Sequence, residues 1–345
     1  MNEVKYRDRR AVQIENASLR VTVLAEGGHI AEILHKKTGI NPLWAPPWPS
    51  IEPSAFDPQK HTQYGTDAEA RLLAGIMGHN LCLDLFGGPS PEEAAAGITV
   101  HGEASVAPYS IRADGAELVA STNAKNAQLY FERRIVLDPD GKTVRITEIV
   151  ENQSALDHPM AWTQHVTLGP PFLKKGSTQL RAPGTRSKVF DAEFGDGQLK
   201  QGAEFDWPMA PRIDGGKQDL RVYTSAPKSS EYTVHLMDPH RDEAFFVAFS
   251  PESKVLFGYR WKRADFPWLG MWEENMSRTQ APWGGKTLTQ GMEFGASPMP
   301  EMRRKMIERG TLFGVPGFRW LPAKGRATVQ YSAFITTANA IPDEI

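Results

Sequence analysis

The dominant pattern along the chain is an alternation of apolar and polar residues with a period of two. In the segment 19–24, leucine and valine alternate with arginine and threonine, and 144–149 repeats this spacing. Such alternation is typical of β-strands that bury one face. On the same grounds, further strands are predicted over 129–137, 232–237, 244–249, 255–261 and 327–336.

Turn-forming residues separate several of these strands. Asp138–Lys142 and Ser250–Ser253 combine aspartate, serine, glycine and proline, and each predicts a hairpin. Helical spacing is scarce. It is clearest over 300–309, where Met302, Met306 and Ile307 would share one face, and a shorter helical segment is predicted over 91–96.

Many short strands in series, with 30 glycines and 26 prolines, favour an all-β architecture. We therefore expect a large antiparallel β-sandwich with few short helices. Neither a linker nor an internal repeat is evident, so one domain is predicted over residues 1–345. The segment 44–58, rich in proline and aromatic residues, is expected to be an ordered surface loop.

Charge and cysteine content narrow the classes of function. With 39 basic and 41 acidic residues the net charge is −2, which provides no strong field for nucleic acid or anionic lipid. A small neutral ligand fits this balance better. Cys82 is the only cysteine, so an intramolecular disulfide and a multi-thiolate metal site are excluded, and its apolar neighbours predict a buried thiol.

The hydropathy of the chain bears on its location. The first residues contain no apolar stretch of signal-peptide length, and no run of about 18 apolar residues occurs anywhere in the sequence. We expect a cytoplasmic protein without a membrane span.

Candidate chemistry lies on three separate apolar segments that are expected to be strand-like. They are Val100–Glu103 with His101, Trp162–His165 with His165, and Gly291–Gly295 with Glu293. Two histidines and a carboxylate are the parts of an acid/base site, and a sheet can bring distant segments together. We expect the three side chains to line one open cleft.

The order of these motifs resembles the galactose mutarotase-like family, which includes aldose 1-epimerases and hexose-phosphate mutarotases. The opening of the chain resembles it too, with a strand at 19–24, the Gly27–Gly28 turn and a strand at 31–34. The resemblance implies a large β-sandwich whose open concave face holds a sugar. His165 and Glu293 should then be far enough apart to hold a pyranose ring between them. The resemblance also implies interconversion of the α and β anomers of an aldose, without a metal or organic cofactor.

By this resemblance, Glu293 would be the base and His165 the acid, while His101 would bind a sugar hydroxyl and Arg71 would make a further contact. Free histidine has a pKa of about 6.5, and burial raises the pKa of a glutamate, so both types suit proton transfer near neutral pH. His79 is a further candidate for the pocket. Because no third histidine or adjacent carboxylate completes a set with His79 and His101, a metal site is not expected.

Other carboxylates and aromatic residues extend the list of candidates. Glu273 and Glu274 are the rivals of Glu293 for the role of base, and only one of the two could enter the site because adjacent strand residues face opposite ways. Asp238 is the nearest match to the family's aspartate contact. Among the tryptophans, Trp268 and Trp272 are expected to stack on the sugar ring.

Two further readings remain open at the level of sequence. One is a carbohydrate-binding protein that keeps the sandwich without turnover, and the other is a relative of polysaccharide lyases or hydrolases. A phosphorylated sugar would need basic residues beside the cleft, for which Arg260, Lys262 and Arg263 are candidates.

Overall fold

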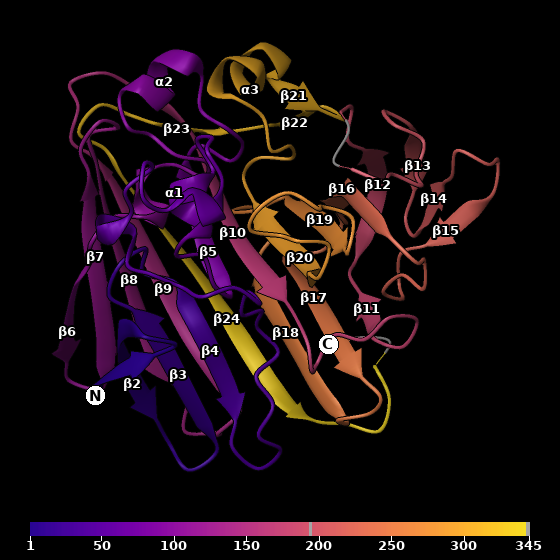
Figure 1. Cartoon of the computed structure of the whole chain (residues 1–345), viewed down its shortest axis with the longest axis horizontal. Helices are drawn as coiled ribbons and strands as arrows, with labels where there is room; N and C mark the ends of the chain where they lie inside the picture. The colour runs from indigo at the N-terminus through magenta and orange to yellow at the C-terminus, as the bar shows by residue number, and fades with distance from the viewer. Residues whose placement is uncertain (193–194, 343–345) are drawn as a thin grey trace.

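Antiparallel strands form most of the regular structure in the computed structural model, which describes residues 1–192 and 195–342. Within these residues two large sheets of 12 and 8 strands pack face to face (Figure 1). The predicted all-β class and antiparallel sandwich are confirmed. The assignment of residues 1–345 to one domain stays a prediction.

The 12-stranded sheet carries the residues on which the candidate chemistry depends. Its strands follow the order β1-β2-β3-β4-β5-β10-β20-β19-β16-β12-β13, and β23 pairs with β10. Their bounds are, in that order, Asn2–Tyr6, Arg9–Glu15, Leu19–Leu24, Ile30–His35, His79–Asp84, His158–Leu168, Leu288–Gly295, Trp268–Asn275, Ser229–Met237, Gly184–Val189, Glu204–Asp206 and, for β23, Arg319–Leu321.

The 8-stranded sheet closes the other side of the sandwich. Its order is β11-β17-β18-β24-β9-β8-β7-β6. The corresponding bounds are Gln179–Arg181, Glu243–Ser250, Val255–Lys262, Arg326–Thr337, Thr143–Asn152, Leu129–Leu137, Glu117–Ala124 and Ser110–Asp114. The predicted strand over 129–137 coincides with β8, and the two predicted hairpins join β8 to β9 and β17 to β18.

The remaining elements are short. Two small hairpins pair β14 with β15 and β21 with β22. The helices α2 and α3 lie at one end of the sandwich, the top in Figure 1, and α1 lies below α2. The bounds are β14 Met209–Pro211, β15 Lys217–Asp219, β21 Thr311–Leu312, β22 Val315–Pro316, α1 Ala70–Leu73, α2 Pro91–Ala95, α3 Arg303–Arg309, and the 3-10 turns η1 Pro53–Ala55, η2 Thr62–Tyr64 and η3 Glu103–Ser105.

The structure corrects two sequence predictions about local structure. The helix predicted over 300–309 is confirmed as α3, but it begins only at Arg303. Of its expected apolar face, Met306 is buried while Met302 and Ile307 are exposed. The segment Val100–Glu103 is a turn rather than a strand, because His101 and Gly102 have φ of 67° and 80°. Apolar neighbours cannot reveal such a left-handed backbone.

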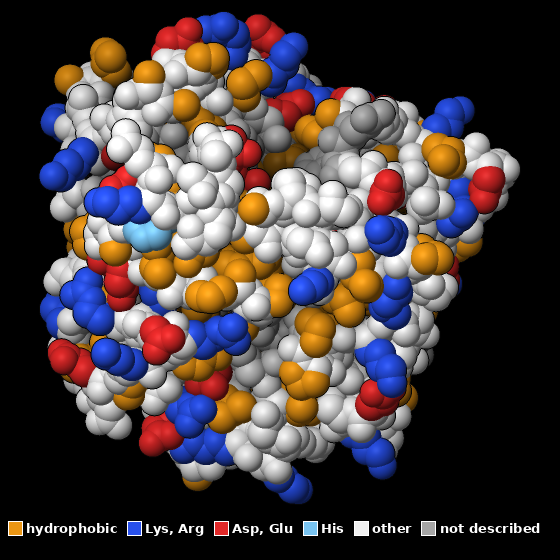
Figure 2. All heavy atoms as spheres, in the orientation of Figure 1, with side chains coloured by type: hydrophobic (Ala, Val, Ile, Leu, Met, Phe, Trp, Pro, Cys, Tyr) orange, Lys and Arg blue, Asp and Glu red, His pale blue; other side chains and the backbone are white. Residues whose placement is uncertain are grey.

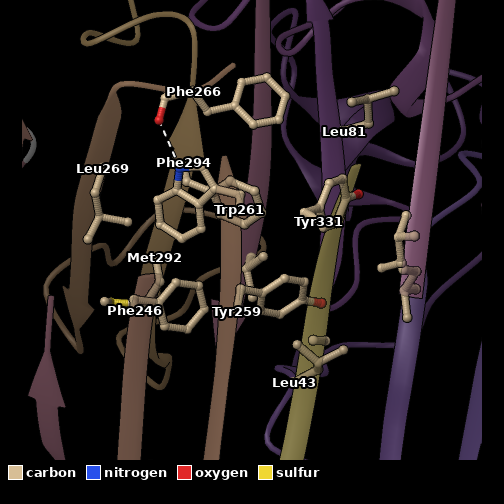
Figure 3. Packing of buried hydrophobic residues seen from close by; sticks show 14 of the residues in the cluster. Leu43, Leu81, Phe246, Tyr259, Trp261, Phe266, Leu269, Met292, Phe294 and Tyr331 are labelled. Atoms are coloured by element: carbon tan, nitrogen blue, oxygen red, sulfur yellow. Dashed lines mark hydrogen bonds between the residues drawn. The ribbon is translucent and has the colours of Figure 1, made fainter. Parts of the chain in front are cut away.

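The main hydrophobic core lies between the two sheets. Figure 3 shows its aromatic part, where Trp261 of β18, Phe294 of β20 and Tyr331 of β24 lie side by side, with the rings of Trp261 and Phe294 stacked at 4.2 Å. A second cluster, which includes Trp44 and Trp272, covers the opposite face of the 12-stranded sheet. The central strands of this sheet are therefore buried on both faces.

Candidate active site

Register across four neighbouring strands brings the predicted acid/base residues together. His165 of β10 pairs with Asn80 of β5 on one side and with Glu293 of β20 on the other, and Glu293 in turn pairs with Gly270 of β19. Paired residues on adjacent strands point to the same face of a sheet. Because Met292 beside Glu293 enters the core between the sheets, Glu293 and His165 face the opposite side.

On that side lies a cavity of about 220 Å³. The cavity opens to the surface in a hollow below α3, between α1 and the strands β16 and β19 (Figure 2). Among the described residues, the polar and aromatic ones that line it are Glu69, Phe86, His101, His165, Tyr232, Trp272, Arg278, Trp283 and Glu293. The cavity thus unites both predicted catalytic residues with His101 and Trp272.

His165 and Glu293 are direct neighbours. Nε2 of His165 lies 3.1 Å from Oε1 of Glu293, and both side chains are almost fully buried. The distance is within hydrogen-bond range, yet Oε1 has no hydrogen-bond partner among the described residues. The expectation that a pyranose ring fits between the two groups is therefore wrong.

Burial favours the uncharged form of both groups, because a charge inside a protein loses its hydration. It raises the pKa of the Glu293 carboxyl well above its usual range. It also lowers the pKa of His165 well below its usual range, and the neighbouring His101 adds to this effect. The uncharged forms of both residues are therefore favoured: a protonated carboxyl group on Glu293 and an imidazole with one unprotonated ring nitrogen on His165.

The other ring nitrogens of the two histidines are held by nearby oxygens. Nδ1 of His165 lies 3.0 Å from Oγ1 of Thr167, the next residue on the same face of β10. Nδ1 of His101 lies 2.6 Å from the backbone oxygen of Phe86, which can only accept, so this nitrogen carries the hydrogen. Burial lowers the pKa of His101 to about 4, so its Nε2 is an acceptor at neutral pH.

The two glycines around Glu293 make room for its side chain. A Cβ on Gly291 would lie 2.4 Å from Oε1 of Glu293 and 3.0 Å from the Cβ of Trp272. A Cβ on Gly295 would lie 2.3 Å from Oγ1 of Thr163. The spacing Gly-x-Glu-x-Gly therefore follows from strand alternation, since all three residues face the crowded cavity side.

Trp272 lies in a cluster of indole rings. Its ring is 5.8 Å from that of His165 and 6.0 Å, edge on, from that of Trp283. Trp283 also packs on Trp44 and Trp48, which lie on the segment predicted to be a surface loop. Nε1 of Trp272 is buried without a hydrogen-bond partner in the described part of the chain. This indole N–H group is therefore a hydrogen-bond donor without an acceptor.

A salt-bridge cluster fixes the upper wall of the cavity, where α3 meets β5. Arg303 of α3 binds the two carboxylate oxygens of Asp84 at 2.7 Å each, and its Nε lies 2.7 Å from Glu93 of α2. His158 also binds Asp84. Although burial acts to raise it, these hydrogen bonds leave the pKa of Asp84 below its usual range.

Two of the other predicted substrate-binding residues lie within the fold but outside the lining of this cavity. His79, on β5, points into the sandwich, where it contacts the hydroxyl of Tyr259 and Oε1 of Gln164. Trp268 lies on the cavity face of β19, but its Nε1 donates to the backbone oxygen of Pro316.

The other three predicted residues serve local structure. Arg71 of α1 donates to the backbone of Pro53, and Asp238 caps the turn after β16. Oε1 of Glu274 accepts hydrogen bonds from the backbone nitrogens of Ser277 and Arg278. Conversely, sequence reasoning missed Glu69 and Arg278 as lining residues.

A larger, open depression of about 1010 Å³ lies on the outer face of the 8-stranded sheet. It is lined by Arg260 and Lys262 among others, so these candidates for binding a phosphate lie on a different sheet from His165 and Glu293. The histidines of the sequence that the structure describes do not line it.

No group of three or more His, Cys, Asp or Glu side chains within residues 1–192 and 195–342 is placed to hold a metal ion. In the same ranges, none of the helices has the length and hydrophobicity of a membrane-spanning segment.

Solved structures with this architecture define the class of fold. A candidate aldose 1-epimerase from Klebsiella pneumoniae subsp. pneumoniae MGH 78578 has a TM-score of 0.67 at 13% identity, over 98% of this chain and 82% of that one. A galactose mutarotase-like protein from Clostridium acetobutylicum has a TM-score of 0.64 at 13% identity, over 98% of each chain. A galactose mutarotase-like protein from Lactobacillus casei ATCC 334 has a TM-score of 0.58 at 12% identity, over 94% of this chain and 100% of that one.

The fold is therefore that of the galactose mutarotase-like proteins, which confirms at the level of the fold the resemblance seen in the sequence. Residues 9–281 match the family described as a domain of unknown function, DUF4432, and the chain belongs to this family. Among curated proteins there is no match.

Proposed function

We propose that the protein is an aldose 1-epimerase-like isomerase that interconverts the α and β anomers of a monosaccharide by acid/base ring opening. The observation that carries the proposal is the pair of His165 and Glu293, 3.1 Å apart in a cavity beside Trp272. The names of similarly folded proteins, among them a candidate aldose 1-epimerase, agree with it.

The reaction needs two proton transfers at neighbouring oxygens. A proton leaves the hydroxyl on C1 while another reaches the ring oxygen, the bond from C1 to the ring oxygen breaks, and an aldehyde forms. Rotation about the bond from C1 to C2 and the reverse transfers give the other anomer. Because both oxygens are bonded to C1, adjacent acid and base groups suit them better than groups on opposite sides of the ring.

The neutral pair supplies one acid and one base. In the pair described above, the carboxyl of Glu293 donates to the ring oxygen and His165 accepts from the C1 hydroxyl. This starting arrangement is the reverse of the one inferred from the resemblance. Ring closure reverses each transfer, so both residues return to their initial state without a cofactor.

Trp272 and His101 would bind the sugar. The indole of Trp272 offers a flat apolar surface for the C–H face of a pyranose. Nε2 of His101 would accept a hydrogen bond from a hydroxyl.

The test is exchange between anomers, measured by magnetisation-transfer NMR and polarimetry on a panel of aldoses, without added metal or nucleotide. Glu293→Gln and His165→Asn should each lower the catalysed rate by ~10²–10⁴-fold, the usual contribution of a general acid or base. Asp238→Asn, which removes a carboxylate outside the cavity, is the matched control and should retain the wild-type rate. Sugar binding without any acceleration across the panel would instead identify a carbohydrate-binding protein.

A further inference from the structure

Glu69 and Arg278 form a charged pair in the lining of the cavity. Nη1 of Arg278 lies 4.0 Å from Oε1 of Glu69, and both side chains retain partial exposure, at 15% and 30%. Glu69 precedes α1, whereas Arg278 follows β19. The pair therefore joins two separate segments at the opening, away from the strands that carry His165 and Glu293.

The guanidinium of Arg278 is held in place from several sides. It lies over the ring of Trp283 at 4.8 Å and over the ring of Trp272 at 5.6 Å. Its Nε is 3.4 Å from Oε2 of Glu274, whose other oxygen accepts from the backbone of the same turn. A group fixed in this way loses little conformational entropy when it binds a ligand.

The charges around the opening disfavour an anionic ligand. Arg278 is the only Lys or Arg among the described residues that line the cavity, and Glu274 already balances its charge. Glu69 adds a second carboxyl group at the opening. A phosphate, with a charge of about −1.5 to −2, would meet the carboxyl group of Glu69 and a single guanidinium whose charge Glu274 already balances.

The size and the unused polar atoms of the cavity favour a small polyhydroxylated ligand. Its volume of about 220 Å³ is below the ~300–1,000 Å³ of pockets for drug-sized ligands, which indicates a single sugar ring. Nε1 of Trp272 and Oε1 of Glu293 are buried there without a partner among the described residues. A hydroxyl can both donate and accept, so it can satisfy either atom.

We propose that Glu69 and Arg278 are a specificity-determining pair that binds two neighbouring hydroxyls of an uncharged monosaccharide and discriminates against phosphorylated and carboxylated sugars. The guanidinium donates to one hydroxyl oxygen, while the carboxylate accepts from the other hydroxyl. This inference rests on the proposed function, because the same cavity must hold the sugar.

Binding is measured apart from turnover in the Glu293→Gln background, by calorimetry and ligand-observed NMR. The probes are glucose, galactose, glucose 6-phosphate, glucuronate and the singly deoxygenated glucoses. The neutral hexose should bind at least about tenfold more tightly than its phosphate, the difference expected for one lost charge-assisted hydrogen bond. Equal or tighter binding of glucose 6-phosphate or glucuronate would overturn the proposal.

Variants then test the pair itself. Arg278→Gln should weaken hexose binding. It should also bind glucose no more tightly than the one deoxyglucose that lacks the hydroxyl bound by Arg278. Glu69→Gln should reduce the preference for hexose over hexose phosphate. Glu92→Gln, which removes an exposed carboxylate of α2 outside the cavity lining, is the control and should leave the preference unchanged.

The outcomes separate the pair from the reaction. If the wild type exchanges anomers and both Arg278→Gln and Glu69→Gln do so at the same rate, the role of the pair is overturned and the isomerase stands. Pair-dependent hexose binding without exchange would overturn the isomerase and support the pair. No binding of any sugar probe would overturn both.

Discussion

At the scale of single residues, the state of the acid/base pair depends on a hydroxyl outside it. Thr167 contacts Nδ1 of His165, and the hydrogen bond at one ring nitrogen decides which tautomer the imidazole adopts. If Nδ1–H donates to Thr167, then Nε2 faces Glu293 with its lone pair. Thr167 would then be a positioning residue for the proposed proton transfer.

Thr167→Val should lower the catalysed anomer exchange by about tenfold, the rate equivalent of the ~1.4 kcal/mol that a buried hydrogen bond contributes. Valine has the shape of threonine without the hydroxyl, so packing is conserved. The pH dependence of the exchange should also shift, because the imidazole loses its fixed tautomer. Thr167→Ser, which restores the hydroxyl, should recover both properties. An unchanged pH profile in Thr167→Val would contradict this role.

The sequence pattern predicted the candidate residues of the site better than the contacts between them. Alternation around Glu293 separates it correctly from Met292 and Phe294. A period of two does not specify the partner strand, however, so the 3.1 Å contact with His165 could not be foreseen. For His79 and Asn80 even the face was undetermined, because β5 is buried on both sides and no polar alternation marks the core.

At the scale of elements, the cavity is a rigid sheet face closed by short segments that are tied to it. Asp84, at the end of β5, binds Arg303 of α3, and Arg303 also binds Glu93 of α2. Pro300, just before α3, and Gly87, just after β5, line the cavity. The position of this wall therefore depends on the salt bridges of Arg303.

Arg303→Met should loosen α3 and α2 while leaving the sandwich folded. The change removes charge-assisted hydrogen bonds from a buried carboxylate, so it should cost ~1–3 kcal/mol locally. Hydrogen–deuterium exchange should rise in the segments 84–95 and 300–309, and KM should increase more than kcat falls. Arg304→Met, an exposed arginine on the same helix, serves as the control. Equal exchange in the two variants would show that the salt bridges do not hold the wall.

The elements that sequence reasoning misjudged are the ones whose shape depends on such contacts. The long strands were predictable because alternation records their burial, as for 129–137 and β8. The turn at His101 and the late start of α3 leave no periodic signal. Glu69 lies in a polar stretch before a single helical turn, and Arg278 lies in a loop, so nothing in their neighbourhood indicated a shared cavity.

At the scale of the whole molecule, the sandwich contains several buried histidines that folding keeps neutral. His235 of β16 is a clear example away from the cavity. It lies 2.8 Å from Oγ of Ser187 and 3.0 Å from Oγ1 of Thr233, and the rings of Phe205 and Trp207 pack on it. Burial lowers its pKa to about 3.

The difference between the pKa of His235 in the folded and in the unfolded protein makes the free energy of unfolding depend on pH. Unfolded His235 binds a proton below pH ~6.5, whereas the folded form stays neutral down to about pH 3. The unfolded state therefore gains the proton, and stability falls as the pH drops below 6.5, by ~1.4 kcal/mol per unit from this group. Urea unfolding at pH 7.0 and 5.0 should show a smaller pH dependence in His235→Gln than in wild type. Parallel pH dependences in the two proteins would exclude this contribution of His235.

The placement of the two proposed functional pairs on different kinds of backbone has an evolutionary consequence. His165 and Glu293 are register partners inside the sheet, where inserting one residue would turn one side chain to the opposite face. Glu69 and Arg278 lie on connections outside the strands, where changes in length are tolerated. If the pairs have the proposed roles, ligand preference could diverge among homologues by insertion and deletion while the acid/base pair keeps its register.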